Sequence, residues 1–177
     1  MKNPFVNSVV VLTSICLIAS VVLAVTNMVT APVIDAAQED ATAQAMKRVL
    51  PEAKSFVEVM PDGAAETVKS VNKDTGGKGY VVTLSTKSQY SKSDMQIAVG
   101  VSADGKIVDI EITNYAETKD FGEEYPKDYI GKDADTLSSV DNVAGVTFSS
   151  SVFKDALNDA LEAYTLVSGE EERDENE

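Results

Sequence analysis

An uncharged apolar run near the N-terminus is the strongest constraint that the sequence places on the fold. Residues 6–29, VNSVVVLTSICLIASVVLAVTNMV, contain no charged side chain, and their few Asn, Ser and Thr residues can bond to the backbone of a helix. A helix of this length extends ~36 Å, enough to cross a hydrocarbon core of ~30 Å with some tilt. Residues 1–30 are therefore predicted to form a transmembrane anchor. A cleaved signal peptide is the alternative, but the run exceeds the ~7–15 apolar residues of a usual signal core.

The charges that flank this run predict its orientation. Lys2 and the amino terminus lie before it, whereas Asp35, Glu39 and Asp40 follow it. Because positive charge favours the cytoplasmic side, we expect a single-pass protein of the inner or cytoplasmic membrane with its N-terminus in the cytoplasm. The rest of the chain would then be extracytoplasmic.

The remainder divides into three parts. Residues 31–51 keep small and apolar side chains at helical spacing until Pro51, which predicts a helical stalk that connects the anchor to the domain. Residues 52–168 are predicted to form the extracytoplasmic domain. The last nine residues, 169–177, have the sequence GEEERDENE, and six acidic side chains against one arginine favour a disordered tail.

The predicted domain is of the α+β class, an antiparallel sheet with packing helices. Residues 78–87, 94–102 and 106–114 alternate apolar and polar side chains, as half-buried strands do, and a tight turn at residues 103–105 joins the last two. Further strands are expected at residues 56–60 and within 66–72. Residues 152–164 place an apolar stripe on one helix face: Phe153, Ala156, Leu157, Ala160, Leu161 and Tyr164.

Missing residue types exclude several classes of function. The chain contains no histidine, and its single cysteine, Cys16, lies in the apolar run. Haem, iron–sulfur and zinc sites therefore lack their usual ligands, and a Ser-His-Asp triad lacks its base. Any redox chemistry would need an organic cofactor. A net charge of −14 argues against nucleic acid as a partner. No metal site and no catalytic acid or base is predicted.

A small-residue turn precedes the last helix. Gly145 allows a tight backbone turn, Ala144 and Val146 add little bulk, and Ser149, Ser150 or Ser151 could cap the helix. The N-terminal amides of such a helix suit a phosphate group. A plain loop with a serine cap is the simpler alternative.

The same residues resemble a known motif. Asp141, Ala144-Gly145-Val146-Thr147, Phe148 and Ser149 are similar to Asp-x-x-Ser/Thr-Gly-Ala-Thr-x-Ser/Thr of the FMN-binding domain family. That family includes the G subunit of the Rnf complex and the C subunit of the sodium-pumping NADH:quinone reductase. In it, a flavin transferase recognises the motif and joins the FMN phosphate to the threonine hydroxyl. The resemblance implies covalent FMN on Thr147, with Asp141 in transferase recognition. Ala144 and Val146 differ from the usual hydroxyl residue and alanine.

A second segment resembles the same family. Residues 115–122, YAETKDFG, are similar to its His-x-Glu-Thr-Pro-Gly-Leu-Gly segment, which lies beside the flavin. Glu117, Thr118 and Gly122 match, and Phe121 replaces leucine, whereas Tyr115, Lys119 and Asp120 differ. The resemblance implies that the matching residues contact FMN.

The resemblance also implies a function. The order of anchor, stalk, strands and motif is that of the family, and the short length favours the G subunit of the Rnf complex, an ion-translocating ferredoxin:NAD oxidoreductase. The chain would be an electron-transfer subunit rather than an enzyme by itself, with the other Rnf membrane subunits and a flavin transferase as partners. One alternative is a single-span FMN carrier outside an ion pump. Another is a membrane-anchored binding domain without redox function, in which Thr147 is a turn residue.

Overall fold

The computed structural model describes residues 4–87, 93–115 and 121–174, which form two compact units, 1–40 and 41–177. The first unit consists of the N-terminal part of helix α1 (Pro4–Val49). Within α1, the segment Ser8–Pro32 has a mean hydropathy of 2.7 over an 18-residue window, and at 25 residues it is long enough to span a membrane. This apolar helix is compatible with a single-pass membrane anchor.

Polar side chains in the apolar part of α1 bond to the helix itself. The hydroxyl groups of Ser14, Ser20 and Thr26 each donate to the carbonyl oxygen four residues earlier, at 2.8, 2.8 and 2.9 Å. This arrangement satisfies each hydroxyl without water, which a helix in hydrocarbon requires.

The second unit contains a five-stranded antiparallel sheet whose strand order follows the chain. Val82 of β3 pairs with Val99 of β4, and Val99 pairs with Ile110 of β5, so the alternating apolar residues of neighbouring strands share one face. The α+β fold predicted from the alternation is therefore confirmed, an antiparallel sheet with packing helices. The strands are β1 (Phe56–Glu58), β2 (Val68–Asp74), β3 (Gly79–Thr86), β4 (Met95–Ser102) and β5 (Ile107–Asn114).

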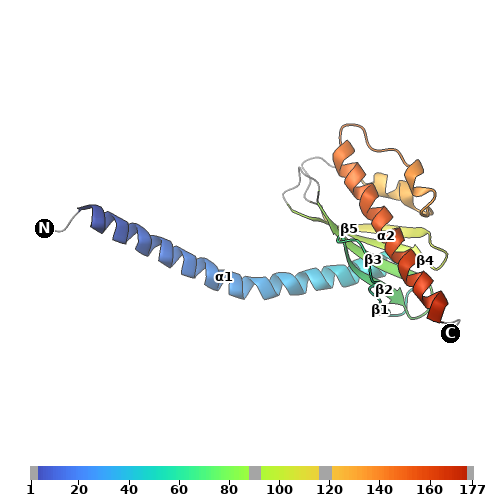
Figure 1. Ribbon diagram of the computed structural model, residues 1–177, viewed down its shortest axis with the longest axis horizontal. Helices are drawn as coiled ribbons and strands as arrows, with labels where there is room; N and C mark the ends of the chain where they lie inside the picture. Colours follow the sequence, from blue (N-terminus) through green and yellow to red (C-terminus); the bar gives the residue numbers. More distant parts are fainter. Residues whose placement is uncertain (1–3, 88–92, 116–120, 175–177) are drawn as a thin grey trace. The chain divides into compact units, whose positions relative to one another are not determined.

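Helix α2 (Thr147–Asp174) packs across one face of this sheet (Figure 1). The stripe predicted for residues 152–164 forms its buried side, and Phe153, Leu157 and Leu161 are each at most 1% exposed. Tyr164 lies against Tyr80 of β3 with 5.3 Å between ring centroids, and its hydroxyl donates to the Ala103 carbonyl at 2.8 Å. These contacts fix the direction of α2 over the main core.

The end of α1 packs on the opposite face. Ala45, Val49 and Leu50 form a smaller core with Val81 of β3 and Ala98 of β4. Gly100 makes this approach possible, since a Cβ there would lie 2.3 Å from the Val49 carbonyl oxygen. Residues 41–49, within the stretch predicted to be a connecting stalk, thus belong to the compact unit that contains the sheet.

The two ends of α2 both differ from the sequence prediction. The helix begins at Thr147, before the three serines, and it reaches Asp174, inside the stretch 169–177 predicted to be a disordered tail. Extending an existing helix avoids the cost of nucleation, and glutamate is a good helix former, so the acidic residues continue α2.

The chain between β5 and α2 folds back along the sheet edge. It contains two short 3-10 helices, η1 (Tyr125–Tyr129) and η2 (Leu137–Ser139). Two hydrogen bonds hold it beside the start of β5: Gly131 N donates to the Ile107 carbonyl at 2.7 Å, and Ile107 N donates to the Lys132 carbonyl at 2.9 Å. Figure 1 shows this segment, in orange, near the N-terminal end of α2.

Candidate functional site

Residues 143–146, here called the glycine turn, lead directly into α2. Val146 N donates to the Val143 carbonyl at 3.2 Å and closes the turn. Gly145 is its third residue, with a φ of +85°, as a type II turn requires. No heavy atom would lie within 4 Å of a Cβ at Gly145, so this residue serves the backbone conformation and leaves the space beside it open. The tight turn predicted from the sequence is present.

Thr147 is the first residue of α2, and its side chain is exposed. The exposed positions around it alternate with partly buried ones, because Val143 and Val146 pack against the main core. Of the residues in this segment predicted to bind the cofactor, Ala144, Gly145, Thr147 and Phe148 are exposed, whereas Val146 is partly buried and Ser149 is buried. The exposed residues of this segment are Asp141, Asn142, Ala144, Gly145, Thr147 and Phe148, the last with 57% of its surface exposed.

The serines after Thr147 lie inside the first turns of α2. Ser149 and Ser150 are buried, at 7% and 0% exposed. The Ser150 hydroxyl accepts a hydrogen bond from Val143 N at 3.2 Å, and carbonyl acceptors of Val146 and Thr147 lie 3.1 Å away. The Ser151 hydroxyl donates to the Phe148 carbonyl at 2.9 Å. Ser150 thus accepts a hydrogen bond from the glycine turn and not from an N–H group of the helix. The helix cap predicted for Ser150 is therefore not formed.

The second predicted segment is only partly described. Glu117 and Thr118 lie outside the described residues, whereas Gly122 is exposed with a φ of +86°. Phe121 is 6% exposed and packs edge-on against Tyr115, with 5.1 Å between ring centroids. Because Phe121 is surrounded by other side chains, its visible role is packing.

Phe121 also joins this segment to α2. Its ring centroid lies 5.0 Å from that of Phe153, which is six residues after Thr147 on the same helix. Two segments separated in sequence by some twenty residues therefore meet at the N-terminal end of α2.

A buried tyrosine pair supports the first turn of α2. The hydroxyl groups of Tyr125 and Tyr129 are 2.6 Å apart, and the Tyr125 hydroxyl donates to the Ser150 carbonyl at 3.4 Å. Burial raises the pKa of both tyrosines, and the hydrogen bond that Tyr129 donates to the Tyr125 hydroxyl raises the pKa of Tyr129 further. Both hydroxyls therefore remain neutral at physiological pH and act as hydrogen-bond donors.

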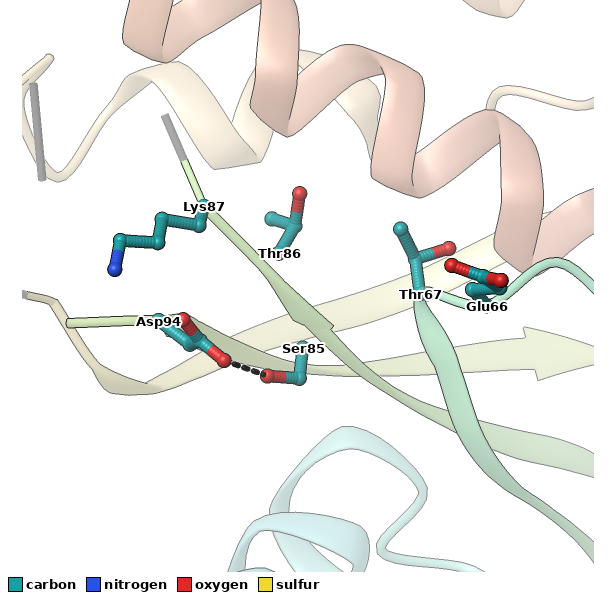
Figure 2. Close-up of a pocket in the computed structure, with 6 residues that line it drawn as sticks. All are labelled: Glu66, Thr67, Ser85, Thr86, Lys87 and Asp94. Carbon is teal, nitrogen blue, oxygen red and sulfur yellow. Dashed lines mark hydrogen bonds between the residues drawn. The ribbon is translucent and has the colours of Figure 1, made fainter. Parts of the chain in front are cut away.

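A polar recess lies at the end of the sheet where β2 begins and β3 ends (Figure 2). Its volume is about 300 Å³, and in Figure 2 Ser85 and Asp94 face each other, with the Ser85 hydroxyl donating to the carboxylate at 3.2 Å. Asn114 of β5 donates to the Asp94 carbonyl at 2.9 Å. The recess is lined by Glu66, Thr67, Ser85, Thr86, Lys87 and Asp94.

Sequence reasoning missed the recess, the buried tyrosine pair and the contact between Ser150 and the glycine turn. The residues of the recess come from the ends of three strands and have no distinctive spacing. The sequence predicts Ser150 only as a helix cap, because its bond to Val143 depends on how the chain turns back on the helix. A serine run after a Gly-Val-Thr turn was the one available signal for it.

The chemistry of the glycine turn suits a phosphoryl group. Thr147 offers one exposed hydroxyl, and Ala144 and Gly145 leave the adjacent space free of bulk. The first turn of α2 adds backbone N–H groups and the positive end of a long helix dipole. A threonine hydroxyl becomes a nucleophile only when a base removes its proton, so ester formation would need an external catalyst.

Comparison with known proteins agrees with this geometry. Residues 91–162 match the family model of the FMN-binding domain. The match contains β4, β5, both short 3-10 helices and the N-terminal half of α2, and so it contains the glycine turn and Thr147. No curated protein matches the chain significantly. The match supports an FMN-binding domain family and a flavin-binding role in electron transfer.

Proposed function

We propose that this protein is a membrane-anchored electron-transfer subunit that carries FMN covalently on Thr147. The observation that supports it most directly is the position of Thr147. This residue is exposed, it begins α2, and it lies next to a turn built on a left-handed glycine inside the region that matches the FMN-binding domain. A phosphoester at this hydroxyl would project into solvent without displacing core residues.

The attachment step needs an activated phosphorus. FMN itself is a phosphate monoester, whereas in FAD the same phosphate forms an anhydride with AMP. In the proposed step, Thr147 Oγ1 attacks the phosphorus of the FMN half of FAD. The bond from that phosphorus to the bridging oxygen breaks, AMP leaves with that oxygen, and a base of the flavin transferase takes the hydroxyl proton.

The residues of this chain would then hold the cofactor. Thr147 supplies the ester oxygen, and the N-terminal turn of α2 stabilises the charge of the phosphoryl group. Ala144, Gly145 and Phe148 form the exposed surface around the ester. Bound FMN would supply the electron-transfer chemistry, because the chain has no histidine and a single cysteine, the usual ligands of haem and iron–sulfur clusters.

The proposed assembly rests on the family resemblance, and the proposed orientation rests on the charges that flank the apolar run. We place the N-terminus in the cytoplasm and the sheet domain outside it, and we propose the other membrane subunits of an Rnf complex as electron-transfer partners. The apolar helix and the FMN-binding domain match support this assignment. Affinity purification of the full-length chain from its native membrane tests it. Recovery of the chain without Rnf subunits would favour a single-span carrier instead.

The covalent bond is tested by flavin fluorescence after denaturation. The full-length chain is co-expressed with a flavin transferase, and the denatured protein is examined in gels and by mass spectrometry of the peptide that contains Thr147. We expect fluorescence and an added FMN in the wild type, and a complete loss of both in Thr147→Ala. Thr165→Ala, which removes another hydroxyl of α2, is the control and should remain fluorescent. A wild type without flavin would refute the proposal and favour a non-redox binding domain.

A further inference from the structure

We infer that Ser150 and Lys154 are positioning residues that hold the glycine turn in the conformation in which Thr147 receives FMN. This inference rests on the proposed attachment at Thr147. Neither residue belongs to the motif at residues 141–149, and each contacts the backbone that precedes Thr147 rather than Thr147's own side chain.

Ser150 fixes the middle of the segment. Its side chain is fully buried, and its hydroxyl accepts from Val143 N at 3.2 Å, while its own backbone N donates to the Val146 carbonyl at 3.0 Å. One residue thus bonds to both ends of the glycine turn. Its hydroxyl hydrogen can bond to the Val146 or the Thr147 carbonyl, each at 3.1 Å. The hydroxyl is therefore satisfied as acceptor and as donor.

Lys154 fixes the beginning of the segment. It lies one helical turn after Ser150, so the two side chains emerge from the same side of α2. The Lys154 ammonium group donates to the Val140 carbonyl. Val140 is itself 9% exposed and belongs to the main core. The chain is consequently held at Val140, at Val143 and at Val146 before Thr147 begins the helix.

The backbone of Ser150 is in turn bonded to the buried tyrosine pair, Tyr125 and Tyr129. The Tyr125 hydroxyl donates to the Ser150 carbonyl, and Tyr125 bonds to Tyr129, which is 0% exposed. Ser150 is therefore bonded both to the buried tyrosine pair and to the glycine turn. The exposed residues among 141–148 are therefore held in one conformation by contacts with buried residues.

A preformed substrate surface lowers the cost of recognition. A transferase that must bind one conformation of a mobile segment loses apparent affinity in proportion to the fraction of molecules in that conformation. Removing the Ser150 hydroxyl leaves the Val143 N–H without its partner and releases the turn from the helix. The defect should then appear in the KM for the protein substrate more than in kcat.

The experiment measures flavin transfer to the full-length protein in detergent, with a flavin transferase and FAD. We expect Ser150→Ala to lower kcat/KM by about tenfold, mainly through KM. Ser151→Ala is the matched control. Its hydroxyl also bonds inside the first turns of α2 but to Phe148, so kcat/KM should stay within about twofold of the wild type. Lys154→Met keeps the aliphatic stem, removes the bond to Val140, and should lower kcat/KM by about threefold.

Two further measurements separate positioning from loss of the fold. Thermal melting gives the fraction of each variant that is folded at the assay temperature. Hydrogen–deuterium exchange of peptides that cover residues 140–146 should be faster in Ser150→Ala and unchanged in Ser151→Ala. If Ser150→Ala does not fold, Lys154→Met decides the question with the same readouts.

The outcomes distinguish this inference from the proposed function. A wild type that accepts FMN, together with equal rates for Ser150→Ala and Ser151→Ala, would overturn the positioning role and leave the attachment at Thr147 intact. A rate loss fully explained by an unfolded fraction would overturn it as well. A wild type that accepts no FMN would instead overturn the proposed function.

Discussion

The glycine turn and the polar recess both place hydroxyl groups near α2, but they are built in different ways. In the turn, Thr147 has an exposed hydroxyl, and the buried residue Ser150 bonds to backbone atoms on both sides of Gly145. In the recess, polar side chains bond to one another, as Ser85 does to Asp94. The first arrangement fixes a backbone and leaves one hydroxyl accessible. The second pairs polar side chains at the surface, as with Ser85 and Asp94.

This difference indicates what a site of covalent attachment requires. The nucleophilic oxygen must be accessible to another enzyme, and the chain that presents it must already have one conformation. The glycine turn meets both conditions, since Thr147 is exposed and residues 143–146 are held from the buried side. In the recess, the Thr67 hydroxyl bonds to the Asp159 carboxylate of α2, so the contact with the helix is made there through side chains and not through the backbone.

The largest effect should come from a change at Gly145. An L-residue at a φ of +85° costs about 1–2 kcal/mol, so Gly145→Ala should distort the turn and lower kcat/KM for flavin attachment by about 5- to 30-fold. Gly131→Ala is the matched control, because Gly131 has a φ of +79° and equally open surroundings but lies beside β5. Both variants should lose similar stability in thermal melts. Equal flavin attachment in the two would remove the distinction between the turn and the rest of the surface.

The sequence predicted those parts of the fold that depend on local patterns. Alternating apolar residues located β3, β4 and β5, and the apolar stripe located the buried side of α2. It placed the start of α2 too late, because serines are common caps and the sequence does not show that Ser150 is buried. The packing of Val49 against Gly100 was also missed, since it depends on a contact between residues 51 positions apart.

The candidate site was predictable for a different reason. Spacing alone left Thr147 as a turn residue, and the family motif singled it out. The supports of the turn could not be found in this way. Tyr125 and Ser150 are 25 residues apart and meet only because η1 returns along the sheet edge. Long-range contacts of this kind are fixed by tertiary structure rather than by local sequence.

A smaller effect is expected in the recess. The Thr67 hydroxyl donates to the Asp159 carboxylate of α2 at 2.5 Å, so Thr67→Val should reduce the free energy of unfolding by about 1–3 kcal/mol. Ser85→Ala, which removes an exposed bond, should cost less than about 0.5 kcal/mol. Denaturant titration measures both losses. Flavin attachment should be unchanged in both variants, and a tenfold loss in either would give the recess a part in presenting Thr147.

The smallest expected effect is a loss of folding stability at alkaline pH. It should depend on the tyrosines that support the glycine turn and not on the residues of the recess. Burial raises the pKa of Tyr125 and Tyr129 in the folded state, whereas both ionise near pH 10 when unfolded. The unfolded state therefore releases these protons first, and stability falls as the pH rises above about 10. None of the six residues that line the recess is a tyrosine.

The slope of stability against pH tests this assignment. Between about pH 10 and 11, Tyr129→Phe should lose stability less steeply than the wild type, because one group that titrates only on unfolding has been removed. Thr67→Val, which alters the recess, should keep the wild-type slope. Urea titrations at a series of pH values measure all three proteins. Parallel slopes for Tyr129→Phe and the wild type would show that the tyrosine pair ionises at the same pH in the folded and unfolded states. The buried tyrosines would then not distinguish the support of the glycine turn from that of the recess.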